Sequence, residues 1–124
     1  MEHLAQSFKG LSEPIRLRAL RLMEHGKLCI CDLVHGLGLP QSTVSRHMAF
    51  LKQAGWVTSQ RQGQWVYYSL AEPQSGLQAM VLEALRQNLP AMEEAQRDYI
   101  RLMRFLETKH EDRCPDRAHP KEAP

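Results

Sequence analysis

Apolar residues recur at helical spacing along most of the chain, and this pattern predicts a mainly α-helical protein. The first two apolar series predict helices over residues 4–11 and 14–25. Ser12 is the expected N-cap of the second helix, because serine side chains accept hydrogen bonds from the free amides at a helix start, and Pro14 suits the first turn. The outward face of this helix is expected to carry Arg16, Arg18 and Arg21.

A helix-turn-helix pattern follows. A short helix is predicted over residues 30–35 and a longer one over 41–54, and the run Gly36–Pro40 between them breaks the helical periodicity. A short helix, a glycine-containing turn and a longer helix form the order of a helix-turn-helix. The buried face of the longer helix is expected to consist of Val44, Met48 and Leu51. Its opposite face has small, hydrogen-bonding and cationic side chains and no acid, which suits entry into the major groove.

Two segments rich in β-branched and aromatic residues, 56–61 and 65–70, predict a β-hairpin directly after the longer helix. The connection Gln62–Gly63–Gln64 supplies a glycine for the turn. A hairpin in this place is a wing, so the predicted fold class is α+β, mainly α: a winged helix-turn-helix. Two further amphipathic segments, 75–89 and 92–106, exceed what one small core needs. They predict a dimer interface shared with the N-terminal helix, and packing within the monomer is the alternative.

Length and composition fit one domain. The 124 residues suffice for a single modest core, which we place at residues 1–108, and the charged, proline-containing stretch 109–124 is expected to be a flexible tail. No apolar run approaches the roughly 20 residues of a membrane span. The N-terminus lacks the basic-then-apolar layout of a secretory signal. These features predict a cytoplasmic protein with no membrane partner.

Acidic residues are absent from positions 33–71, whereas Arg46, Lys52 and Arg61 lie within this stretch. A segment without negative charge suits a surface that faces phosphate, so a double-stranded DNA partner is predicted. The sequence has no glycine-rich phosphate loop, no nucleophile elbow and no acid–base pair in a recognisable motif. An enzymatic activity is therefore not predicted.

Two thiols one residue apart, Cys29 and Cys31, stand where the predicted helix-turn-helix begins. Thiolates bind soft metals and metalloids, and they also undergo redox chemistry. On a regular helix these two side chains would point about 200° apart, so one ion bound to both requires a frayed or distorted helix start. A pyramidal trivalent ion takes three thiolates, and Cys114 in the tail is the candidate for the third. Two ordinary buried cysteines are the alternative interpretation.

Three segments resemble the ArsR/SmtB family of metalloregulatory repressors: residues 27–33 its cysteine-containing metal-binding motif, 41–57 its recognition helix, and 61–68 its wing. The resemblance implies a homodimeric winged-helix repressor whose inducer binds Cys29 and Cys31. The arsenic-responsive branch often has a third cysteine three residues later, where this chain has Val34. Zinc-sensing members use Asp, His and Glu between their last helices. This chain has Glu94 and Asp98 there but no histidine, so a zinc site of that kind is not expected.

We therefore predict a transcriptional repressor that binds operator DNA as a homodimer and is released by trivalent arsenic or antimony. The predicted ligands of this inducer are Cys29, Cys31 and Cys114. The predicted DNA contacts are Gln41, Ser42, Thr43, Ser45, Arg46, His47, Lys52, Arg61, Gln62 and Gln64. The alternatives are a thiol-redox-sensing repressor, a repressor that responds to cadmium, lead or zinc, and a metal-buffering protein without an operator.

Overall fold

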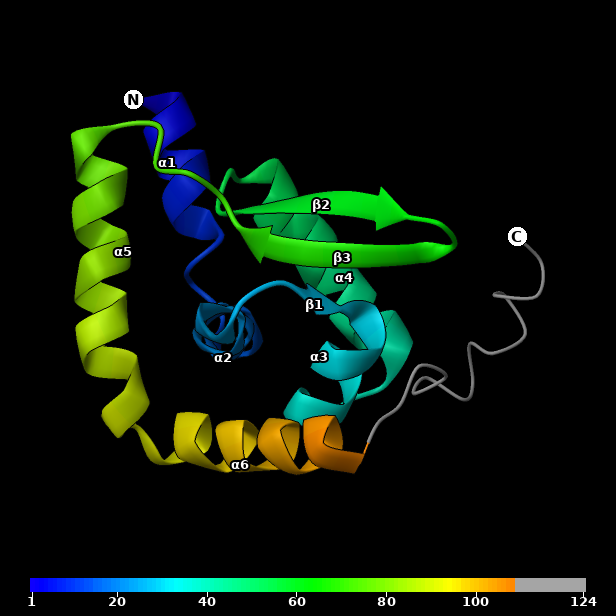
Figure 1. Ribbon diagram of the computed structural model, residues 1–124. Helices are drawn as coiled ribbons and strands as arrows, with labels where there is room; N and C mark the ends of the chain where they lie inside the picture. Colours follow the sequence, from blue (N-terminus) through cyan, green and yellow to red (C-terminus); the bar gives the residue numbers. More distant parts are fainter. Residues whose placement is uncertain (109–124) are drawn as a thin grey trace.

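The computed structural model describes residues 1–108 of the chain; the predicted tail and Cys114 lie outside this range. The described part is mainly helical, with one small antiparallel sheet (Figure 1). Its α-helices are α1 (Glu2–Lys9), α2 (Pro14–Leu22), α3 (Ile30–Leu37), α4 (Gln41–Gln53), α5 (Gly76–Asn88) and α6 (Glu93–Thr108). Its strands are β1 (Leu28–Cys29), β2 (Val57–Gln62) and β3 (Trp65–Leu70). Within the described residues, no helix is both long and apolar enough to cross a bilayer.

The N-cap predicted for α2 is wrong. Glu13 occupies that position, and its Oε1 accepts a hydrogen bond from the amide of Ile15 at 2.7 Å. The Ser12 hydroxyl instead donates to the carbonyl of Lys9 at 2.8 Å, so it is already engaged at the end of α1. The helix is also shorter than predicted, because the chain tightens into a 3₁₀ turn over Met23–His25.

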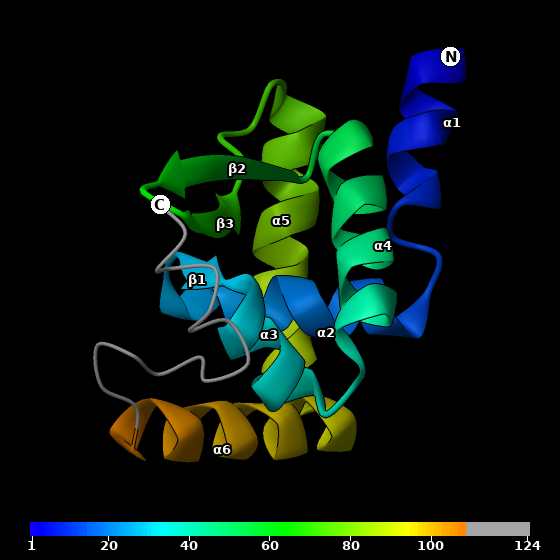
Figure 2. The same ribbon diagram turned by 90° about the vertical axis from the view of Figure 1, so that its right-hand side faces the viewer.

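The helix-turn-helix is formed by α3 and α4, which lie at an angle to each other; in Figure 2 α3 lies below the hairpin and α4 stands beside it. The turn begins at Gly38, whose φ of 68° is in the left-handed region that favours glycine. The predicted inner face of α4 is confirmed, since Val44, Met48 and Leu51 are fully buried. These three side chains belong to one core that also includes Leu22, Leu33 and Trp56.

The hairpin is also confirmed. Strands β2 and β3 pair in the register Val57↔Leu70 to Gln62↔Trp65 around a turn at Gly63. The sheet has a third strand that was not predicted, since β1 pairs with the opposite edge of β3 in the register Leu28↔Tyr68 and Cys29↔Tyr67. A two-residue strand shows no periodicity in the sequence, and its partner lies about 40 residues away. The consequence is that the first thiol is part of the wing's sheet.

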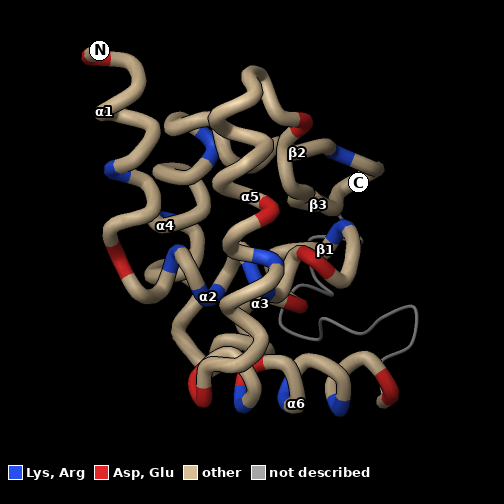
Figure 3. The backbone as a smooth tube through the Cα atoms, turned by 90° about the vertical axis from the view of Figure 1, so that its left-hand side faces the viewer, with Lys and Arg blue, Asp and Glu red and all other residues tan. Residues whose placement is uncertain are grey.

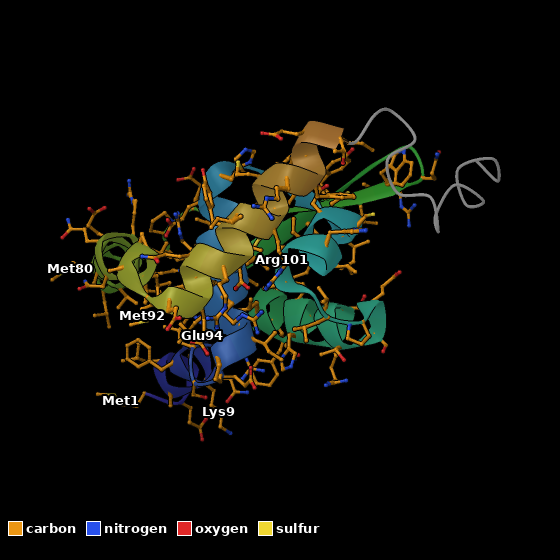
Figure 4. The ribbon with its side chains drawn as sticks, turned by 90° about the horizontal axis from the view of Figure 1, so that it is seen from below. Met1, Lys9, Met80, Met92, Glu94 and Arg101 are labelled. Atoms are coloured by element: carbon orange, nitrogen blue, oxygen red, sulfur yellow. The ribbon has the colours of Figure 1, made fainter. Side chains whose placement is uncertain are left out.

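Helix α6 packs within the monomer, which is the alternative that the sequence left open for this segment. Its inward side carries Leu102, which is fully buried, and Asp98, which is 1% exposed. The Asp98 carboxylate accepts two hydrogen bonds from Arg18 of α2, at 2.8 and 2.9 Å, and a third from Arg101. Figure 4 shows Arg101 on the side of α6 that faces α3. The buried carboxylate of Asp98 therefore joins α6 to α2 through these ion pairs.

The expectation that Arg16, Arg18 and Arg21 face outward is wrong for all three. Arg16 is buried, while Arg18 and Arg21 are only partly exposed. Arg18 reaches across the core edge to the carbonyl of Leu37 at 2.8 Å, and Arg101 reaches the carbonyl of Gly36 at 3.0 Å. A buried guanidinium is tolerated where carbonyls and carboxylates accept its N–H groups. These contacts satisfy the C-terminal carbonyls of α3 and fix the position of the helix-turn-helix against α2 and α6.

Candidate thiol site and nucleic-acid interface

The two cysteines lie where β1 ends and α3 begins, and the sulfur of Cys31 takes part in a disulfide. Cys29 is the N-cap of α3 with an extended backbone (φ −82°, ψ 168°), and Cys31 is the second residue of the helix. The carboxylate of Asp32 accepts a hydrogen bond from the amide of Cys29 at 2.9 Å and completes a capping box with the Cys29 side chain. Because Cys29 precedes the helix, the divergence expected of two side chains on a regular helix does not apply, and both thiols belong to one cluster.

Aromatic rings surround this thiol cluster. Cys29 is 2% exposed and Cys31 is 3% exposed, and the cluster they form packs against Trp65 and Tyr67 of β3 and Phe105 of α6. The sequence did not indicate these aromatic neighbours, since they come from segments far away along the chain. The wing, the first helix of the helix-turn-helix and the C-terminal helix therefore meet at the thiols. A group that binds there has to move at least one of them, because little space separates buried side chains.

His35 stands beside the second thiol, one helical turn further along α3. Its Nδ1 lies 3.8 Å from the Cys31 Sγ and 3.0 Å from the Cys31 carbonyl oxygen. Its ring stacks on Phe105, with the two centroids 3.8 Å apart and the planes inclined by 6°. Within residues 1–108, no group of three or more His, Cys, Asp and Glu side chains is arranged to hold a metal ion. The predicted third ligand, Cys114, lies outside the described residues.

The outer face of α4 matches the surface predicted from the sequence. Gln41, Ser42, Arg46 and Lys52 are exposed, and Thr43 and Ser45 are partly exposed. Figure 3 shows basic positions and no acidic position along α4, in contrast with the mixed charges of α6. This face thus presents hydrogen-bonding and cationic groups to solvent without a nearby carboxylate on the same helix.

The wing is connected to α4 by a side-chain hydrogen bond. The ammonium group of Lys52 donates to the hydroxyl of Ser59 in β2 at 2.7 Å. At the tip of the hairpin, Arg61 and Gln62 are exposed and Gln64 is partly exposed. The structure therefore leaves the predicted wing contacts accessible, on a hairpin that projects from the helical body (Figure 1).

His47 differs from the other predicted DNA contacts. It lies on the flank of α4 that faces α2, and its Nδ1 is 3.0 Å from Nη1 of Arg16. The ring is partly buried, and this burial lowers the pKa of His47 below its ordinary value. This contact could not be predicted from the sequence, because the two residues are 31 positions apart.

These elements define a winged helix-turn-helix protein: two helices joined by a tight turn, a β-hairpin directly after the second helix, and further helices on both sides. The model of the family described as bacterial regulatory protein, arsR family, matches residues 13–59. That segment runs from the start of α2 through α3 and α4 into β2.

The chain is also similar to known transcriptional regulators and to a solved winged helix-turn-helix structure. The chain is 47% identical over 64 residues to the arsenic resistance transcriptional regulator ArsR1 of Pseudomonas putida, which covers 51% of this chain and 50% of that protein. It is 38% identical over 72 residues to the HTH-type transcriptional regulator MJ1325 of Methanocaldococcus jannaschii, covering 57% of this chain and 81% of that protein. The solution structure of the homodimeric winged helix-turn-helix DNA-binding domain of Mb0332 from Mycobacterium bovis matches with a TM-score of 0.60 and 26% identity, over 74% of this chain and 86% of that one.

The chain belongs to the arsR family of bacterial regulatory proteins. It spans about half the length of the Pseudomonas putida regulator.

Proposed function

We propose that this protein is a cytoplasmic transcriptional repressor that binds operator DNA as a homodimer and releases it when arsenite or antimonite binds to its cysteine thiolates. The proposal assigns the protein no enzymatic activity. Its DNA-binding part rests on the family and on the acid-free outer face of α4 next to the wing. Its inducer part rests on the thiol pair and on the arsenic-resistance regulator to which the chain is similar.

The single observation that carries the proposal is the position of the thiols. Cys29 is paired with Tyr67 in the sheet of the wing, and the same residue caps the first helix of the helix-turn-helix. A soft ion held by Cys29 and Cys31 has to displace the capping box or the aromatic side chains around it. Either displacement alters the position of α3 or β3, and with it the relation between the recognition helix and the wing. DNA contacts that require both elements in register are then lost.

The dimer part of the proposal rests on two helices that leave apolar side chains uncovered. No residue of α1 or α5 is buried. Leu4 and Phe8 on α1 are exposed, as are Leu77 and Met80 on α5. Figure 1 shows both helices on the same side of the molecule, and Met80 points outward from α5 in Figure 4. A second copy that covers this side would remove these apolar groups from water and would place two recognition helices on one DNA duplex.

Trivalent arsenic takes thiolate donors, and Cys29 and Cys31 lie in one cluster; the disulfide at Cys31 has to be reduced before its sulfur can bind the ion. We propose Cys114, from the same or the partner subunit, as the third. X-ray absorption on the arsenite-loaded protein counts sulfur neighbours directly. Three sulfurs in the wild type and two in Cys114→Ser would support this ligand set, and an unchanged count would contradict it.

Replacing Arg46 with alanine is expected to weaken operator binding by about tenfold or more, because a guanidinium on the outer face of α4 is placed to reach a base edge or a phosphate, and a bidentate base contact is worth ~1–3 kcal/mol. Arg104→Ala provides the matched control, since Arg104 is also exposed but lies on α6. Fluorescence anisotropy with labelled operator gives both affinities. Equal losses in the two variants would argue against a recognition role for α4.

A mobility-shift assay with the DNA upstream of the protein's own gene tests repression against metal buffering. Contacts through Arg46, Lys52 and Arg61 should make this binding steeply salt-dependent, because each neutralised phosphate releases counterions. We expect a discrete complex at low salt that dissociates as salt rises. Absence of a complex at low salt would contradict the repressor and favour a metal-buffering protein.

A further inference from the structure

The guanidinium of Arg16 connects α1 to the recognition helix. Its side chain is buried, with 8% of the residue exposed. Its Nε donates to the carbonyl of Gly10 at 2.8 Å, and its Nη2 donates to that of Lys9 at 3.2 Å, so it satisfies the last carbonyls of α1. On the α4 side, its Cζ lies 4.1 Å from the ring centroid of Phe50, and its Nη1 contacts the Nδ1 of His47 at 3.0 Å.

Close packing around Arg16 leaves the junction between α1 and α4 little room to move. Gly10 is buried, and a Cβ at that position would lie 2.9 Å from the Cβ of Ala54, which directly follows α4. The indole Nε1 of Trp56 donates to the carbonyl of Ser7 at 2.6 Å. Figure 2 shows α1 and α4 side by side. The position of α4 relative to α1, one of the two helices in the proposed dimer interface, is therefore set at this junction.

The chemistry of the Arg16–His47 contact requires a neutral histidine. An arginine side chain is always protonated in proteins and can only donate, so the Nδ1 that faces it must accept and carries no proton. The proton of the neutral ring is then on Nε2. Within residues 1–108, no carboxylate lies within ion-pair distance of Arg16. A proton added to Nδ1 would therefore bring two positive charges together without a counter-charge in contact with them.

We propose that Arg16 is a positioning residue that holds the recognition helix α4 against α1, that it does so only while His47 is neutral, and that operator affinity therefore falls in mild acid. This inference rests on the proposed DNA binding. It is opposite in sign to a direct phosphate contact, since a protonated His47 on a phosphate would strengthen binding as the pH falls.

The electrostatics around His47 support the neutral form. Burial lowers the pKa of His47 below its ordinary value of 6.5; Glu13 at the start of α2 opposes this shift, whereas Arg16 and Arg46 add to it. Because the pKa is lower in the folded protein than in the unfolded chain, the unfolded chain takes up the proton first as the pH falls. The stability that this group contributes is complete above pH 6.5 and is lost as the pH drops through the folded-state pKa.

The experiment compares operator affinity at about pH 7.5 and about pH 5.5 in three full-length proteins, by fluorescence anisotropy without inducer. The variant is His47→Asn, whose side-chain oxygen keeps an acceptor near the place of Nδ1 but does not titrate. The control is His25→Asn, which removes an exposed histidine outside α4. We expect the wild type and His25→Asn to lose affinity several-fold between the two pH values, and by no more than about tenfold, which is the limit for a single group whose pKa lies below 6.5. His47→Asn should show a flat profile.

A wild-type profile that equals that of His47→Asn, or an affinity that rises in acid, would overturn the inference. Circular dichroism at each pH verifies that the compared proteins are folded. Urea unfolding of the same proteins gives a readout that does not depend on DNA: between about pH 7.5 and about pH 5.5 the proteins with His47 should lose more stability than His47→Asn. If the wild type fails to bind operator even at the higher pH, the proposed function is wrong, and the urea profile still decides whether Arg16 and His47 are coupled.

Discussion

Replacing Cys29 or Cys31 with serine is expected to abolish the response to arsenite, while the variants still form the DNA complex. A hydroxyl is a poor ligand for a soft ion, so the inducer loses one of its two described donors. Serine is also among the best N-cap residues, so Cys29→Ser should preserve the start of α3. The measurement is the arsenite concentration that half-releases labelled operator, together with the arsenic retained by the protein after gel filtration.

Cys114→Ser extends this series. If Cys114 supplies the third donor, this variant should respond only at higher arsenite concentration, between the wild type and the two other variants. Release by arsenite that persists unchanged in both Cys29→Ser and Cys31→Ser would remove the basis for an inducer site at these thiols. Mild peroxide distinguishes thiol-redox sensing, because a reversible disulfide that accompanies loss of DNA binding would favour that alternative.

Replacing Asp98 with asparagine is expected to lower the free energy of unfolding by about 3 kcal/mol. Removing one partner of a buried ion pair costs ~3–5 kcal/mol, because the charge that remains is left uncompensated. The low end of that range applies here because the side chains of Arg18 and Arg101 are 21% and 43% exposed, so water screens them in part. The hydrogen bond to Asp98 also raises the pKa of Arg18, so the carboxylate stabilises the charged guanidinium. Urea unfolding at fixed protein concentration measures the loss.

Glu93→Gln is the matched control for Asp98→Asn. Glu93 lies on the same helix and pairs with Arg97 at 3.2 Å, but both side chains are largely exposed. An exposed pair of this kind contributes less than ~0.5 kcal/mol. Similar small losses in both variants would show that the two arginines do not depend on Asp98 to fix the end of α3.

The elements that local periodicity encodes could be predicted from the sequence. The apolar residues on the inner face of α4 recur every three or four positions, and the two strands of the hairpin flank a glycine turn. The predicted bounds of the helix and of the strands therefore agree with the structure to within a few residues. Strand β1 could not be predicted, because two residues carry no period and the strand exists only through its pairing with β3. The sequence therefore located the thiols at the start of α3 but not their connection to the wing.

Contacts between side chains that are far apart in the sequence could not be predicted either. The arginines of α2 were expected to face solvent because charged side chains are usually exposed. In the structure, Arg16 instead contacts a backbone carbonyl and His47. Arg18 donates a hydrogen bond to Asp98, which is 80 positions away. The aromatic residues around the thiols come from β3 and α6. Tertiary packing creates each of these environments, so only a structure reveals them.

The most direct measurement for the central claim is an arsenite titration of the preformed complex between the protein and labelled operator, followed by fluorescence anisotropy. Because the thiols lie between the wing and the first helix of the helix-turn-helix, a bound ion should release the DNA. We predict that anisotropy falls to the value of free DNA while arsenic stays on the protein. Anisotropy that remains high with arsenic bound at Cys29 and Cys31 would contradict the account.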